Sequence, residues 1–197
     1  MKKMEKYVGK DKIVGRPIRL NKVTLNPNGK GYAELLFWGD VHLGHPQCLI
    51  NKAKAALKYA LENHIYVIGM GDYLESGTRE SVGDSVYQQK LNPQEQLEEM
   101  ITTLSPIAKA GLLIGLLEGN HENRITKMTS INVTKIMAKM LDVPFLGYSC
   151  WNLLAVGNMK YTMYATHGSS GSRFKHTKMK AAMDIAHWIE ADLIAMG

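Results

Sequence analysis

The stretch Leu35-Leu36-Phe37-Trp38-Gly39-Asp40-Val41-His42 shows the pattern from which the fold can be predicted. Four apolar residues are followed by a glycine and then by two potential metal ligands, Asp40 and His42. A short continuous apolar run of this kind is typical of a strand that is buried on both faces. Residues two apart on extended backbone point to the same side, so we expect Asp40 and His42 to lie together.

Three further apolar runs also end at potential metal ligands. In open α/β sheets, ligands bind beyond the carboxyl ends of the strands, so these side chains are expected to meet in one site. The runs and the residues that follow them are Ile65–Met70 with Gly71-Asp72, Leu112–Leu117 with Gly119-Asn120-His121, and Tyr161–Thr166 with His167-Gly168.

Helical patterns separate these runs, and the alternation of strands and helices predicts an α/β fold. Asn92 followed directly by Pro93 is typical of a helix start, and we expect that helix to reach Ala110. Other helices are expected from Pro46 to Asn63, from Ile131 to Leu141 and from Met179 to Ile189. The methionines between Met128 and Met140, together with Met179 and Met183, are expected to fill the core.

The remaining strands are predicted from turn signals. Asn26–Gly31 between Val23–Leu25 and Tyr32–Trp38 favours a hairpin or tight turn. Trp151–Val156 and Tyr161–Thr166 are expected to pair around Gly157-Asn158. Ser76–Lys90 is expected to be a long loop, and Leu193–Met196 to begin a last strand.

The composition excludes several classes of protein. The chain has 197 residues, of which 45% are hydrophobic and 21% charged, close to the average for globular proteins. It contains no run of about 18 apolar residues, so no membrane-spanning helix is expected. The N-terminus resembles no signal peptide, and Cys48 and Cys150 lack the spacing of a zinc site. We therefore expect a cytoplasmic protein without a membrane partner.

The net charge of +6 is concentrated near the N-terminus. Residues 1–30 contain nine Lys or Arg and two acidic residues, whereas residues 31–197 contain 15 basic and 16 acidic residues. We interpret 1–30 as a basic arm and 31–197 as one domain. Such an arm can follow the phosphates of a nucleic acid, or it can be an ordinary solvated segment, and both interpretations stay open.

The residues at the strand ends offer carboxylate, imidazole and amide groups but no thiolate. These ligands suit Mn²⁺, Fe or Zn²⁺. Asp72 could bridge two ions about 3.5–4 Å apart, as in two-metal hydrolases. Each element alone is more commonly a turn or a helix cap, so only the ordered set of four predicts a metal site.

In these motifs the chain resembles the calcineurin-like metallophosphoesterases. The matching motifs are Gly39-Asp40-Val41-His42-Leu43-Gly44, Gly71-Asp72-Tyr73-Leu74-Glu75, Gly119-Asn120-His121-Glu122 and His167-Gly168. The resemblance implies a two-sheet sandwich flanked by helices and a site with two divalent ions, for which Mn²⁺ is our first choice. It implies one ion on Asp40, His42 and Asp72, and a second on Asp72, Asn120 and His167. It also implies that His121 protonates the leaving oxygen or steadies the phosphate.

The chain departs from the family pattern in two places. Glu75 stands where the family has a second aspartate, which is normally a supporting group. The family also closes with Gly-His-x-His after a late strand, whereas this sequence reads Leu193-Ile194-Ala195-Met196-Gly197. From the resemblance we expect that this domain is incomplete at its C-terminus and that each metal lacks one histidine ligand.

These observations predict a metal-dependent phosphoesterase with His121 as the catalytic residue. The basic arm favours phosphodiesters or nucleic acid as substrate, with a phosphomonoesterase or protein phosphatase as the alternative. A non-catalytic scaffold with the same fold is the rival class. Arg124 and Arg173 are candidate phosphate ligands, because guanidinium groups match phosphate geometry. His45 could also contact phosphate, although a surface role in its loop is the commoner case.

Overall fold

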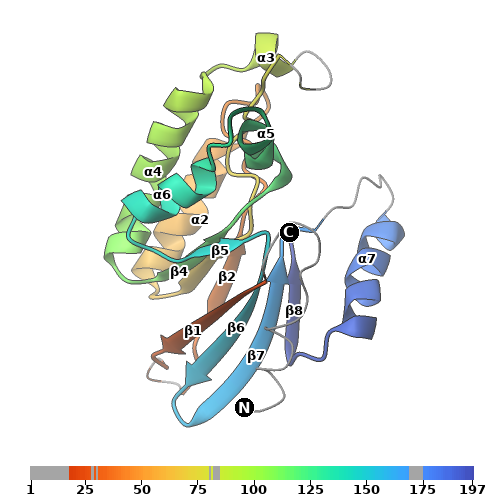
Figure 1. Ribbon diagram of the computed structural model, residues 1–197. Coiled ribbons are helices and arrows are strands. Elements are labelled where there is room, and N and C mark those ends of the chain that lie inside the picture. Colours follow the sequence, from red (N-terminus) through yellow and green to blue (C-terminus); the bar gives the residue numbers. More distant parts are fainter. Residues whose placement is uncertain (1–17, 28, 30, 80, 82–84, 169–174) are drawn as a thin grey trace.

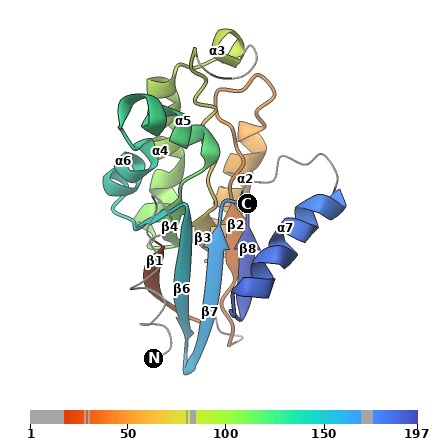
Figure 2. The same cartoon turned by 45° about the vertical axis from the view of Figure 1, so that its right-hand side comes forward.

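The computed structural model describes residues 18–27, 29, 31–79, 81, 85–168 and 175–197. They form two four-stranded sheets, with strand orders β2-β3-β4-β5 and β1-β6-β7-β8. Figures 1 and 2 show the two sheets facing each other, with α2, α4 and α6 on the outer side of the first sheet and α7 beside β8. The α/β class predicted from the sequence is confirmed.

The first sheet consists entirely of parallel strands. Its strands are β2 (Leu35–Trp38), β3 (Tyr66–Gly69), β4 (Leu113–Leu117) and β5 (Phe145–Gly147). Every residue of β3 and β4 is buried, which agrees with their continuous apolar sequence. Because the strands are parallel, the segments that follow β2, β3 and β4 leave the sheet at the same edge.

The second sheet is mixed and contains the predicted pair around Gly157-Asn158. Its strands are β1 (Arg19–Leu25), β6 (Ser149–Val156), β7 (Met159–Thr166) and β8 (Leu193–Met196). β6 and β7 are antiparallel, and β8 runs parallel to β7. The hairpin expected at Asn26–Gly31 is wrong, because β1 pairs in parallel with β6 and β2 belongs to the other sheet. The chain therefore passes from one sheet to the other between β1 and β2, and the partner of β1 lies more than 100 residues away in the sequence.

The helices differ from the sequence prediction at four points. They are α2 (Ile50–Glu62), α3 (Ser85–Gln88), α4 (Pro93–Lys109), α5 (Asn120–Thr129), α6 (Val133–Met140) and α7 (Lys175–Trp188). α3 lies inside the segment Ser76–Lys90 that was expected to be a loop, and α7 begins at Lys175 and not at Met179. α2 begins at Ile50 and not at Pro46, because a tight turn precedes it in which the Cys48 N–H donates to the His45 carbonyl at 3.0 Å. α5 was not predicted, since its sequence is polar and has no clear apolar stripe.

The methionine prediction is correct at Met137, which is 1% exposed, but wrong at other positions. Met128 and Met140 lie at or next to helix ends and are 45% and 64% exposed. Met179 and Met183 on α7 are each 67% exposed, so that face of the helix is turned away from the sheets. Among the described residues, no helix is both long enough and apolar enough to cross a membrane.

We predict that Asn92→Ala lowers the free energy of unfolding by about 1 kcal/mol, because the Asn92 side chain caps α4. Its oxygen accepts from the N–H groups of Gln94 and Glu95 at 3.0 Å, and Glu95 accepts from the Asn92 N–H at 2.8 Å. Urea unfolding measures the change. Asn51→Ala, on the exposed surface of α2, is the matched control and should leave stability unchanged or slightly higher.

Candidate metal centre

The segments that follow β2 and β3 run side by side beyond the ends of the strands. The N–H groups of Asp40 and His42 donate to the carbonyls of Gly71 and Asp72, each at 3.0 Å. The Leu43 N–H donates to the Tyr73 carbonyl at 2.9 Å. This ladder continues the β2–β3 pairing and brings Asp40 and His42 alongside Asp72.

Three of the expected metal ligands have left-handed backbone conformations. The φ angles are 51° at Asp40, 50° at His42 and 50° at Asp72. Residues other than glycine rarely adopt such angles, and each costs of the order of 1–3 kcal/mol. Asp40 and His42 are therefore not extended, and the extended-backbone argument for their shared side was wrong. They nevertheless lie together, with 4.0 Å between His42 Nε2 and Asp40 Oδ1.

Two glycines allow the segments to approach closely. A Cβ on Gly71 would lie 2.7 Å from Nδ1 of His167 and 2.8 Å from the Cα of Gly119. A Cβ on Gly119 would overlap the backbone nitrogen and Oδ1 of Asp72. The close approach of the segments after β3 and β4 thus depends on glycine at both positions.

Glu122, in the first turn of α5, fixes these segments with a fully buried carboxylate. Its Oε2 accepts from the N–H groups of Asp72 at 3.1 Å and Gly119 at 3.0 Å, and its Oε1 accepts from the Leu74 N–H at 2.9 Å. Burial, together with the charge on Asp72, raises the pKa of Glu122 to about 7, although the N–H donors act in the opposite direction. This role of Glu122 was not predicted from the sequence, although a Glu three residues after the Gly that follows a strand has the spacing of a helix-capping box.

Asp40, Asp72 and His167 form one group of possible metal ligands. Nδ1 of His167 lies 2.8 Å from the Met70 carbonyl and must carry a proton to bond with it. Nε2 then faces two oxygens, Oδ1 of Asn120 at 2.8 Å and Oδ1 of Asp72 at 3.4 Å. These atoms can converge only around a proton or a cation.

The pKa values in this group show the same demand for positive charge. Burial disfavours the charged form of His167, but its contact with Asp72 outweighs this and raises the pKa of His167 to about 9. Burial alone would raise the pKa of Asp72, but the bonds from His167 and the His121 N–H leave it lowered. Asp72 is therefore ionised at neutral pH, and its charge is available to a cation.

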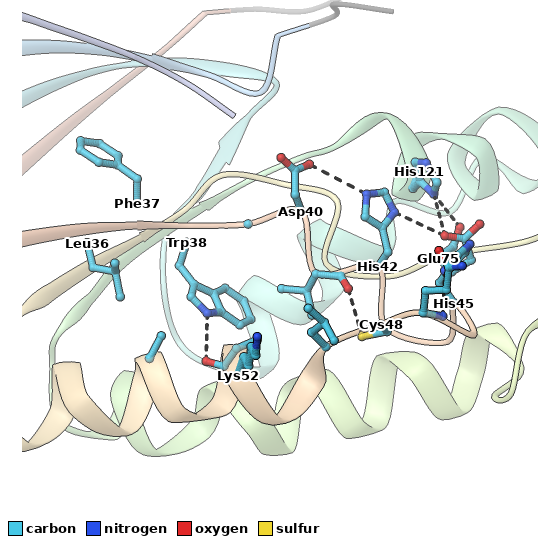
Figure 3. A pocket seen from close by; sticks show the side chains of 16 residues that line it. Leu36, Phe37, Trp38, Asp40, His42, His45, Cys48, Lys52, Glu75 and His121 are labelled. Atoms are coloured by element: carbon cyan, nitrogen blue, oxygen red, sulfur yellow. Dashed lines mark hydrogen bonds and ion pairs between the residues drawn. The ribbon is translucent and has the colours of Figure 1, made fainter. Parts of the chain in front are cut away.

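His42, Glu75 and His121 form a second group of possible ligands. Oε2 of Glu75 lies 3.4 Å from Nδ1 of His42 and 3.5 Å from Nδ1 of His121. Nε2 of His42 points the other way, toward Asp40 (Figure 3), and lies 3.8 Å from Oδ2 of Asp72. Metal-ligating histidines commonly bond a carboxylate through their second nitrogen. In this arrangement Glu75 supports His42, which can then bind an ion together with Asp40 and Asp72.

His121 is held by three contacts. Its backbone N–H donates to Oδ1 of Asp72 at 2.9 Å, and its Nδ1 lies 2.9 Å from the Glu75 carbonyl. Its Nε2 lies 3.0 Å from Nη2 of Arg124, a group that can only donate. Burial lowers the pKa of His121, although Asp72 partly offsets this effect. The structure therefore presents His121 as a neutral imidazole that accepts a hydrogen bond from Arg124.

The structure brings together most of the site residues that the sequence predicted. Asp40, His42, Asp72, Asn120 and His167 converge, and His121 and Arg124 lie beside them. Arg173 lies outside the described residues. The sequence matches no protein-family model, and no curated protein matches it.

We predict that Glu122→Gln lowers the free energy of unfolding by about 2–3 kcal/mol, because an amide NH₂ would face a backbone N–H where the carboxylate now accepts. Urea unfolding measures the loss. Glu118→Gln is the matched control, since Glu118 is also buried but Thr126 and Asn132 both donate to the same one of its oxygens, Oε1. An equal loss in both variants would contradict the role given to Glu122.

Proposed function

We propose that this chain is a metal-dependent phosphoesterase with a calcineurin-like fold and a site for two divalent ions. The observation that carries the proposal is the position of Asp72. Its Oδ1 faces His167 at 3.4 Å, and its Oδ2 faces His42 at 3.8 Å. Each oxygen thus belongs to a different ligand set, as a bridging carboxylate between two ions requires.

Both proposed ligand sets offer oxygen and nitrogen atoms, and one of them also contains an amide. Asp40, His42 and Asp72 would hold one ion, and Asp72, Asn120 and His167 the other. Carboxylate, imidazole and amide ligands suit Mn²⁺, Fe or Zn²⁺, and Mn²⁺ is our first choice. Bound ions would neutralise the phosphate oxygens and lower the pKa of a water molecule.

His121 and Arg124 would act on the substrate from the side of Glu75. When a phosphate oxygen accepts the Arg124 N–H groups, Nε2 of His121 loses its hydrogen-bond donor. That nitrogen can then take a proton and pass it to the leaving oxygen, while Nδ1 remains bonded to the Glu75 carbonyl at 2.9 Å. Binding of the phosphate would thereby prepare His121 for its role as a general acid.

A phosphodiester or nucleic acid is the substrate class that we favour, because residues 1–30 carry nine basic and two acidic residues. Hydrolysis of phosphomonoesters alone would instead favour a phosphatase. Binding of two ions without any hydrolysis would instead favour a non-catalytic scaffold protein with the same fold.

We predict that Asp72→Asn abolishes Mn²⁺-dependent hydrolysis of bis(p-nitrophenyl) phosphate and reduces the content of bound metal. Without the shared charge, two close cations cannot be neutralised. Circular dichroism should remain that of the wild type, and EDTA should remove the activity of the wild type. Asp184→Asn, an exposed carboxylate on α7, is the control and should change neither property. Normal activity with two ions bound to Asp72→Asn would contradict the bridging role.

We predict a different result for His121→Ala. Both ions should remain bound, while kcat falls by about 10²–10⁴-fold, the usual contribution of a general acid. Metal analysis and steady-state kinetics on the same samples test this, with His187→Ala on the exposed face of α7 as the control. If metal is lost together with activity, His121 is a ligand, as its place in the group with His42 and Glu75 allows.

A further inference from the structure

A cavity of about 730 Å³ leads away from the ligand groups along β2. Figure 3 shows that its lining follows the strand from Leu36 to Asp40 and ends at His42, Glu75 and His121. The part that is distant from the ligands is lined by Leu36, Phe37, Leu49, Lys52, Ala53 and Ala56. One end of this groove is therefore the candidate metal centre, and the other end is mainly apolar.

The groove runs over the free edge of β2. In the described part of the chain, β2 pairs with β3 and with no strand on its other side. The carbonyls of Glu34 and Trp38 accept from β3 and the residue after it, at 3.0 and 2.8 Å. Because backbone groups alternate along a strand, the N–H and C=O of Phe37 point away from β3. A ligand in the groove would thus meet donor and acceptor groups that no described residue pairs, as well as apolar side chains.

The apolar surface in the groove is shallow and partly open to solvent. Ala53 and Ala56 lie one turn apart on α2, and their small side chains leave a flat surface beside Leu36. Leu49 is 64% exposed and Lys52 is an exposed cation in the same lining, whereas the Phe37 side chain points from β2 to the side opposite α2 (Figure 3). On the α2 side, a flat apolar surface with backbone hydrogen-bonding groups at the strand edge and one cation suits a planar ring with polar edges better than a flexible hydrocarbon chain.

We propose that this groove binds the organic group of the ester, and that this group is an aromatic ring system of the nucleobase type in a phosphodiester. This inference rests on the proposed function, since it places the reacting phosphate at the ions that Asp72 would bridge. The ring would then contact Leu49, Ala53 and Ala56 on α2, its polar edge would bond the exposed backbone of β2, and Lys52 would face a neighbouring phosphate. Leu49 is thus a specificity-determining residue of the site.

Calorimetric titration of the Mn²⁺-loaded protein with phenylphosphonate and methylphosphonate tests the groove without requiring turnover. The two probes share the phosphonate group and differ in the organic group. We expect phenylphosphonate to bind about tenfold more tightly, because the ring buries apolar surface that a methyl group cannot. Equal affinities, or binding of neither probe, would overturn the inference.

Leu49→Ala should reduce the preference for phenylphosphonate to less than about threefold, while methylphosphonate binds as before. Tyr161→Ala on β7 is the matched control, since Tyr161 is 43% exposed and lies outside the groove. Leu49→Ser is a second test that is compatible with folding, because Leu49 lies at the N-cap of α2, where serine is favoured. If Leu49→Ala and Leu49→Ser both keep the tenfold preference, the groove does not bind the ring.

Two further results separate the alternatives. Tighter binding of hexylphosphonate than of phenylphosphonate would assign the groove to a lipid-like chain and overturn the aromatic assignment. If the protein hydrolyses bis(p-nitrophenyl) phosphate but binds both phosphonates equally, the role of the groove is overturned and the proposed function remains intact. Absence of both metal binding and hydrolysis would overturn the proposed function.

Discussion

The buried carboxylate of Glu122 is the interaction on which the rest of the centre depends. It accepts three backbone N–H groups, from Asp72, Leu74 and Gly119, and so joins the segments that follow β3 and β4. A buried carboxylate without such donors would be strongly unfavourable, and the donors would be unsatisfied without it. The place of Asp72 between the two ligand sets follows from this bond, together with the glycines that let the segments meet.

The centre combines backbone strain with unbalanced charge. Asp40, His42 and Asp72 have left-handed φ angles, and the inter-segment hydrogen bonds offset their cost. The Glu75 side chain is only 6% exposed, yet among the described residues its carboxylate makes ion-pair contacts at 3.4–4.0 Å and accepts no hydrogen bond. Strain and buried negative charge at the same strand ends are what a preorganised cation site requires, because the ligands need not move when an ion binds.

The sequence predicted the parts of the fold that depend on local patterns. The apolar runs of β3 and β4, the cap of α4 at Asn92 and the pair β6–β7 follow from neighbouring residues, and so do the ligands at the strand ends. The parallel pairing of β1 with β6 joins residues more than 100 positions apart, which no local pattern encodes. The roles of Glu122 and of the Arg124–His121 contact also depend on tertiary packing, and a polar helix such as α5 has no apolar stripe from which to predict it.

A bridge by Asp72 between two ions can be observed by anomalous diffraction from Mn²⁺-soaked crystals. Data collected above and below the manganese edge locate the metal without reference to activity. We predict two anomalous peaks about 3.5–4 Å apart on either side of Asp72, one beside Asp40 and His42 and one beside Asn120 and His167. Crystals that bind manganese elsewhere, with no peak within coordination distance of the Asp72 carboxylate, would contradict it.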